Sequence, residues 1–283
     1  MAYLRPTTLD AALDALDKAP WVVLAGGTDH FPARVGRRPT ENVLDIGGLA
    51  ALRRIEDRGD HWRLGAGVTW SDLIAADLPP LFDGLKQAAR EIGGKQIQNA
   101  GTIVGNVCNA SPAADGVPPL LCLGASLVLA SREAALETSL ERFIEGPRRV
   151  QRQPNQIVTG ILVPKPKGRA VGGFAKLGAR RYLVISIVMA AALLEIDDAG
   201  AIAEARIAVG ACSPVARRLP VLEMTLLGRV CDGGLGRLVE PDHLAPLHPI
   251  DDIRADADYR RDAAVTIVSR LLAELGRRLG SAA

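Results

Sequence analysis

The stretch that decides the fold is GGKQIQNAGTIVGNVCNASPAADGVPPLLCLG, residues Gly93 to Gly124. It contains the pair Gly93-Gly94 and single glycines at Gly101 and Gly105, with Asn, Thr and Ser between them. Little apolar surface is available before Leu120, so one packed helix or strand through the whole stretch is not expected. Glycine is placed where the backbone needs φ > 0 or approaches another group closely. We therefore expect an irregular, glycine-rich segment.

The centre of this stretch has the composition of an anion site. Between Gly101 and Gly105, Thr102 supplies a hydroxyl, and Asn106 follows with a side-chain amide. N–H groups that converge in a loop hold a phosphate without needing a cation. Spacing alone leaves a plain glycine-rich surface loop as the alternative.

A second glycine turn lies closer to the N-terminus. Val22–Ala25 has the composition of a short buried strand and runs directly into Gly26-Gly27-Thr28-Asp29-His30. A strand that ends in Gly-Gly and is followed by a hydroxyl and a carboxylate presents N–H groups to a dinucleotide. No Gly-x-Gly-x-x-Gly follows a strand and opens a helix, and no Gly-x-x-x-x-Gly-Lys-Ser/Thr occurs. The sequence therefore predicts neither a Rossmann fingerprint nor a nucleoside-triphosphate P-loop.

These two turns, with three further segments, resemble one family. The chain is similar to the FAD-binding (medium) subunit of the molybdenum hydroxylases, the xanthine dehydrogenase and carbon monoxide dehydrogenase flavoprotein group. The resemblance covers nearly the whole chain because its pieces occur in order from end to end. They are YLRPTTLDAALDAL from Tyr3, AGGTD from Ala25, QNAGTIVGNVCNASPAAD from Gln98, FAKLGARR from Phe174 and HPIDDIRADADYRR from His248.

The resemblance implies an α+β architecture. It has a two-part FAD-binding domain of the vanillyl-alcohol-oxidase-like (PCMH) type, residues 1–168, and a smaller sheet-and-helix C-terminal domain, residues 169–283. Lys165-Pro166-Lys167-Gly168 has linker composition, and we expect the domain boundary there.

The resemblance also implies a function. FAD on this chain would take electrons from the iron–sulfur clusters of a small subunit and pass them to NAD or another acceptor. The organic substrate would be oxidised at molybdenum on a large subunit, so no catalytic or metal-binding residue is expected here. The cofactor-binding positions that it implies are Leu24, Ala25, Gly26, Gly27, Thr28, Asp29, His30, Ile92, Gly101, Thr102, Gly105, Asn106, Cys108, Asp115, Val158 and Lys176.

Several of these residues also have an ordinary structural interpretation. His30 is either a partly exposed loop histidine or a neighbour of the flavin ring, and Asp29 is expected to cap the first turn. Cys108 is either a buried inert thiol or part of the cofactor cavity. Asp115 is either a helix N-cap or an acceptor for flavin hydroxyls. Lys176 matches a family lysine that reaches the flavin, whereas a solvated side chain is the usual state of lysine.

Composition limits the class of protein. The 283 residues are 48% hydrophobic and 23% charged, which is typical of a globular protein. The formal net charge is only +2, which argues against nucleic acid as the main partner. No run of 18 apolar residues and no signal-peptide pattern occurs, so we expect no membrane span and a cytoplasmic location. The four cysteines are scattered, without the spacing of a zinc or iron–sulfur site.

Periodic patterns predict most of the elements. Apolar residues at helical spacing indicate helices, short apolar runs indicate strands, and an apolar run beside Asp57–His61 on each side indicates a hairpin. The predicted helices are 9–16, 69–76, 81–92 and 262–278. The predicted strands are 22–25, 42–46, 52–56, 62–66, 126–130, 157–163, 182–196 and 202–209.

Two departures from the family pattern keep rival functions open. Thr-Ile-Gly-Gly-Asn of the family is Thr102-Ile103-Val104-Gly105-Asn106 here, and Val104 must hold a negative φ. After Arg181 the chain reads Tyr-Leu-Val-Ile-Ser, without the acid often found before Ile, so a different acceptor preference is expected. The rivals are a self-sufficient FAD-dependent oxidoreductase and a flavin-free scaffold subunit, the latter if Val104 spoils the cradle.

Overall fold

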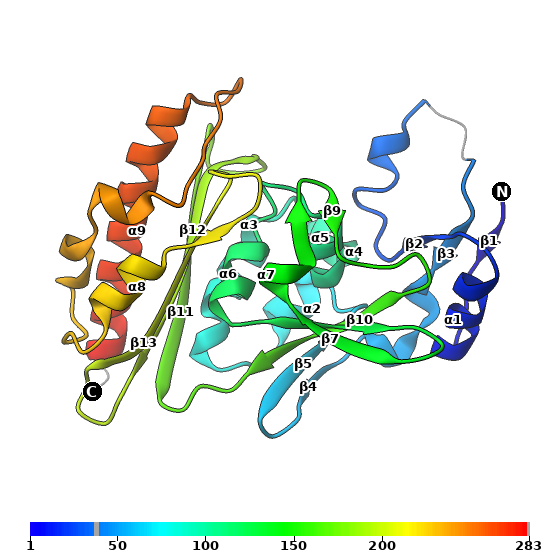
Figure 1. Ribbon diagram of the computed structural model, residues 1–283, viewed down its shortest axis with the longest axis horizontal. Coiled ribbons are helices and arrows are strands. Elements are labelled where there is room, and N and C mark those ends of the chain that lie inside the picture. The colour runs from blue at the N-terminus through cyan, green and yellow to red at the C-terminus, as the bar shows by residue number, and fades with distance from the viewer. Residues whose placement is uncertain (37–39, 282–283) are drawn as a thin grey trace.

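The computed structural model describes residues 1–36 and 40–281. In Figure 1 the chain runs from a small N-terminal sheet on the right, through a central sheet with short helices, to a sheet and long helix on the left. Mixed helices and sheets confirm the predicted α+β class. None of the helices among the described residues has the length and apolar character needed to cross a membrane.

The N-terminal sheet is small and parallel. Its order is β1-β3-β2, and the helix that accompanies it, α1, begins after Thr8, whose hydroxyl accepts from the N–H of Ala11 at 3.3 Å. The predicted helix and both predicted strands are confirmed. The bounds are β1 Tyr3–Leu4, α1 Leu9–Lys18, β2 Val22–Leu24 and β3 Val43–Asp45.

The central sheet is antiparallel, in the order β4-β5-β10-β6-β7. The predicted hairpin is formed by β4 and β5, and the predicted strands at 126–130 and 157–163 are β6 and β10. A separate pair, β8 and β9, follows the short helix α7. The bounds are β4 Ile55–Asp57, β5 His61–Gly65, β6 Ser126–Ala130, β7 Ala135–Ser139, α7 Leu140–Phe143, β8 Ile144–Gly146, β9 Arg149–Val150 and β10 Ile157–Pro164.

Short helices fill the space between the central and C-terminal sheets (Figure 1). The expectation that Gly93 to Gly124 is irregular is wrong, because this segment forms three short helices. They are too short to be stable alone and are held by burial of residues such as Ile103, Val107 and Leu120. The predicted 81–92 helix begins later, after a 3₁₀ turn at Pro80–Phe82. The bounds are α2 Trp70–Ala75, α3 Asp83–Glu91, α4 Lys95–Ala100, α5 Ile103–Asn109 and α6 Val117–Cys122.

The C-terminal sheet has the order β11-β12-β13-β14 and is covered on both faces. The long helix α9 packs on one face, and α3 and α6 pack against the sheet from the central part (Figure 1). The predicted terminal helix is longer than expected because Asp256 caps it, accepting from the N–H of Tyr259. The bounds are β11 Arg169–Gly178, β12 Ser186–Ile196, β13 Ile202–Gly210, β14 Arg217–Arg218, α8 Pro220–Leu226 and α9 Ala257–Gly280.

Burial on both faces explains why β12 is apolar at every position except Ser186 and Glu195. All its residues are buried: Met189 and Ala191 join the core shared with the central sheet, whereas Val188 and Ala190 face the core under α9. The strand predicted from residue 182 begins only at Ser186. The preceding residues form bends in which the Arg180 guanidinium donates to the carbonyl of Leu183, whose φ is +52°.

Backbone contacts join the C-terminal sheet to the central part. A Cβ at Gly84 of α3 would lie 2.8 Å from the carbonyl oxygen of Gly173 in β11, and a Cβ at Gly172 would lie 2.3 Å from that of Leu81. These glycines permit an approach that any larger residue would prevent. The close approach places β11, and with it Lys176, beside the helices of the central part.

Candidate functional site

The first glycine turn follows β2 and lies directly against the end of α4. A Cβ at Gly26 would lie 1.8 Å from the carbonyl oxygen of Ala100, so only glycine fits there. Gly27 has φ +70°. Among the described residues, no acceptor is found for the N–H groups from Gly26 to His30. Consecutive free N–H groups in such a turn form a concave, partly positive surface that suits an anion.

The second turn is the junction of α4 and α5 rather than the loop expected from the sequence. Thr102 is the N-cap of α5, and its hydroxyl accepts from the N–H of Gly105 at 2.9 Å. Val104 lies in the first turn of α5, which confirms its predicted negative φ. The N–H groups of Thr102 and Val104 find no acceptor within the described part of the chain.

The two turns meet, although about seventy residues separate them in the sequence. A Cβ at Gly101 would lie 3.3 Å from the Thr28 hydroxyl oxygen and 3.5 Å from the ring of Trp70. Trp70 is almost fully buried and also packs against Gly116. Trp70 was not predicted as a site residue, because a single buried aromatic residue carries no local signal of a ligand site.

Asn106 has an unsatisfied polar atom at this place. Its Oδ1 is buried and has no hydrogen-bond partner among the described residues, and a Cβ at Gly116 would lie 2.9 Å from it. Buried amide oxygens are rarely left without a donor, because the lost hydration costs about 1–3 kcal/mol. The atom therefore indicates a ligand that carries a hydrogen-bond donor.

Asp115 and Lys176, predicted as separate ligand contacts, are joined to each other. Lys176 Nζ donates to Asp115 Oδ2 at 2.6 Å, and Ser186 Oγ donates to Asp115 Oδ1 at 2.5 Å. The side chains of Asp115 and Lys176 are only 8% and 6% exposed. Burial raises the pKa of Asp115 above its ordinary value, and the charge of Lys176 and the two hydrogen bonds oppose that rise. Ser186 carried no motif and was missed.

Lys176 also lines a cavity of 590 Å³ between α3 and β11. Gln87, Arg90 and Glu91 come from α3, and Phe174 comes from β11 beside Lys176. Arg180, Arg181 and Val184 complete one side. Four of the lining side chains are basic and one is acidic, so the cavity favours an anionic or electron-rich occupant.

The remaining predicted positions surround the two turns less directly. His30 is half-buried beside Phe31, and burial, followed by the charge of Arg34, lowers the pKa of its imidazole. Asp29 is exposed, and its carboxylate has no donor among the described residues, so the expected cap is absent there. Burial raises the pKa of the Cys108 thiol to about 11, which makes it unreactive near neutral pH.

Four further predicted positions are apolar residues that are buried or partly buried. Leu24 is buried at the end of β2, and Ala25 follows it, partly buried. Ile92 ends α3, directly before Gly93. Val158 is buried on β10 at a bulge. No group of three or more His, Cys, Asp or Glu side chains able to hold a metal ion occurs in residues 1–36 and 40–281.

Two family models match the chain. Residues 1–166 match a FAD binding domain in molybdopterin dehydrogenase, and residues 174–275 match a CO dehydrogenase flavoprotein C-terminal domain. The chain belongs to the FAD-binding subunits of the molybdenum hydroxylases. It is thus a subunit of an oxidoreductase, and its cofactor is FAD.

Individual relatives agree with this family. The nicotinate dehydrogenase FAD-subunit of Eubacterium barkeri is 30% identical over 210 residues, which cover 70% of each chain. The xanthine dehydrogenase FAD-binding subunit of Escherichia coli O157:H7 is 28% identical and covers 96% of this chain and 95% of its own. In the solved structure of carbon monoxide dehydrogenase from Hydrogenophaga pseudoflava, one chain superposes with a TM-score of 0.84 at 25% identity. That match covers 97% of this chain and 96% of the other.

The residues present fit FAD. A dinucleotide needs donors for its pyrophosphate, and the free N–H groups after Gly26 and at the start of α5 are such donors. It also carries hydroxyl donors, which the unpartnered Asn106 Oδ1 can accept. Val104 leaves this arrangement intact because it occupies a helical position.

Proposed function

We propose that this chain is the FAD-carrying electron-transfer subunit of a heteromeric molybdenum-containing dehydrogenase. Electrons arrive from the iron–sulfur clusters of a small partner subunit and leave to NAD or another acceptor. The organic substrate is oxidised at molybdenum on a large partner subunit. FAD supplies the redox chemistry when bound, and the chain binds, orients and surrounds it.

The observation that carries this proposal is the meeting of the two glycine turns. Gly26 lies against Ala100, so donors from two distant segments converge at one place. We propose that the turns after β2 and before α5 hold the pyrophosphate, with Thr28 and Thr102 adding hydroxyls. Asn106 accepts from a hydroxyl of the bound cofactor.

The cavity beside Lys176 supports the placement of the flavin end and of the acceptor. It lies where the C-terminal sheet meets α3, and its basic lining suits an electron-rich ring and the phosphates of a nucleotide acceptor. Arg180 and Arg181 are exposed at this cavity and can receive an acceptor such as NAD from outside.

Assembly with partners is supported by the surface next to the same cavity. Tyr182, Leu183 and Ile185 are each about half exposed, which is unusual for three large apolar side chains so close together. We propose that this segment contacts a partner subunit. Arg148 and Arg278 are engaged within the chain instead, since Arg148 binds Asn109 and Arg278 pairs with Asp83.

The proposed location is the cytoplasm. The four cysteines are free thiols, as expected in a reducing compartment. Burial raises the pKa of the thiols of Cys122, Cys212 and Cys231 well above the ordinary value, so they are inert structural residues.

The test is an anaerobic titration followed at the flavin absorbance band. We expect the purified chain to hold FAD and to stay oxidised with purines, aldehydes or carbon monoxide. Dithionite should reduce it, and addition of the iron–sulfur and molybdenum subunits should allow reduction by the true substrate. Rapid reduction of the lone chain by an organic substrate would establish the self-sufficient oxidoreductase instead. A purified chain that binds no FAD would establish the scaffold.

A further inference from the structure

In the buried group formed by Lys176, Asp115 and Ser186, both carboxylate oxygens are bonded, whereas the Lys176 ammonium has donor capacity left. One oxygen of Asp115 accepts from Lys176 and the other accepts from Ser186. Ser186 is only 2% exposed. The Lys176 ammonium has three protons. Within the described residues, only the bond to Asp115 uses one of them, although the side chain is almost fully buried.

The unused ammonium protons of Lys176 lie at a cavity, which indicates a ligand there. Lys176 lines the 590 Å³ cavity, and no second carboxylate within the described chain pairs with its ammonium. A buried ammonium that lacks acceptors is costly, so an occupant of the cavity that offers oxygen or nitrogen acceptors would complete it.

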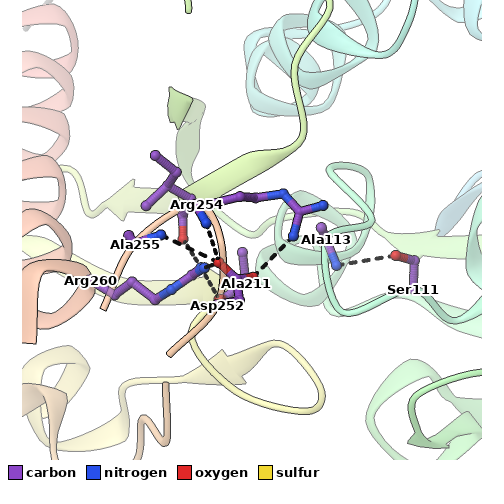
Figure 2. A network of polar contacts seen from close by, with 8 residues as sticks. Ser111, Ala113, Ala211, Asp252, Arg254, Ala255 and Arg260 are labelled. Atoms are coloured by element: carbon purple, nitrogen blue, oxygen red, sulfur yellow. Dashed lines mark hydrogen bonds and ion pairs between the residues drawn. The ribbon is translucent and has the colours of Figure 1, made fainter. Parts of the chain in front are cut away.

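The backbone next to Ser186 and the loop before Asp115 are linked through Arg260, whose polar contacts with Asp252 and Ala211 are drawn in Figure 2. The Arg260 guanidinium donates to the carbonyl of Ile187, next to Ser186, at 2.7 Å and to that of Ala211 at 3.1 Å. The N–H of Ala211 donates in turn to the carbonyl of Pro112, in the loop that leads to Asp115.

Arg260 is in turn held by Asp252. Asp252 accepts from Arg260 at 2.7 Å and from Arg254 at 3.0 Å, so the guanidinium of Arg260 is held in one orientation (Figure 2). The strand start that carries Ser186 and the loop that carries Asp115 are thus held by one network. Such support is what keeps a functional side chain in a single position.

Resting on the proposed function, we infer that Ser186 is a positioning residue for the bound flavin. Through Asp115, it holds the Lys176 ammonium in one position at the cavity wall. A fixed positive charge there stabilises the reduced, more electron-rich flavin more than the oxidised one. Ser186 thereby raises the reduction potential of the cofactor without touching it.

The test compares reduction potentials of the FAD-loaded full chain. Ser186→Ala removes the hydrogen bond to Asp115, and we expect the preference for reduced over oxidised flavin to fall about tenfold, a decrease of about 30 mV for two electrons. Ser213→Ala is the matched control, because Ser213 is equally a buried serine of the C-terminal part but bonds Cys212 and His248. Its potential should stay at the wild-type value.

A double-mutant cycle separates positioning from a general structural effect. Lys176→Gln alone should lower the potential at least as far, and adding Ser186→Ala to it should cause no further decrease. If Ser186→Ala does not fold, Ser186→Cys, whose thiol is only a weak donor, takes its place in the same cycle. An unchanged potential in a FAD-loaded Ser186→Ala chain, or additive decreases in the double variant, would overturn the inference while the proposed function stands. A wild-type chain that binds no FAD would overturn both.

Discussion

The contact between the two glycine turns gives the sharpest prediction, for the substitution Gly26→Ala. The added methyl carbon would lie 1.8 Å from the carbonyl oxygen of Ala100, whereas ordinary contact begins near 3.4 Å. Because both neighbours are backbone, the turns must separate by about 1.5 Å. Hydrogen bonds from N–H donors of one turn to a pyrophosphate held by the other would then exceed bonding distance.

The size of the effect follows from the donors lost. If two N–H groups no longer reach the pyrophosphate, each costs about 1–3 kcal/mol. The dissociation constant for FAD should therefore rise by about 30-fold to 10⁴-fold. The assay is a titration of FAD into the flavin-free chain, followed by flavin fluorescence, with circular dichroism to establish that the variant is folded.

Gly146→Ala is the control for this substitution. Gly146 has an ordinary φ, and a Cβ there would first meet the flexible Arg149 side chain at 3.5 Å. This variant should bind FAD as the wild type does. A folded Gly26→Ala chain with wild-type affinity would refute the reasoning, because it would mean that the pyrophosphate is not held where the turns meet.

Two further predictions concern buried polar groups. Asn106→Ala should weaken FAD binding by about 1–3 kcal/mol while leaving the thermal stability of the flavin-free chain equal or higher, since the Oδ1 lacks a partner there; a clear loss of stability in calorimetry would contradict this. For Asp115, whose folded-state pKa is raised by burial, the stabilising contribution is complete below the unfolded-state value of about 3.9 and is lost as the pH rises through the folded-state value. Urea unfolding of the flavin-free chain should show this fall with pH, and Asp115→Asn should remove it; equal pH profiles would contradict it. The charged groups that face Asp115 or line the adjoining cavity are Lys176, Arg90, Glu91, Arg180 and Arg181.

The sequence alone determined the local elements and the family. Apolar residues at helical spacing predicted α1, which Thr8 caps in the structure, and Gly26-Gly27 after a short apolar run predicted the end of β2. These signals are readable because a cap, a turn and a periodic face depend only on residues close together in the chain. The order of the five motif segments along the chain indicated the FAD-binding subunit family.

Helix formation between Gly93 and Gly124 was decided by tertiary structure. Its helices have six or seven residues each, so their own propensity is insufficient, and packing of residues such as Ile103 against the central sheet stabilises them. The start of β12 at Ser186 likewise could not be predicted from the sequence, because an apolar run does not show which of its residues pair with another strand.

The partners within the site were also decided by tertiary structure. Asp115 lies 61 residues from Lys176 and 71 residues from Ser186, and no periodic pattern links positions so far apart. Their pairing depends on the close approach of Gly84 to Gly173, which brings the C-terminal sheet against α3. Local chemistry therefore specified which residues could serve a cofactor. Packing of distant backbone determined which of them act together, because a hydrogen bond forms only where the folded chain places donor and acceptor within about 3 Å.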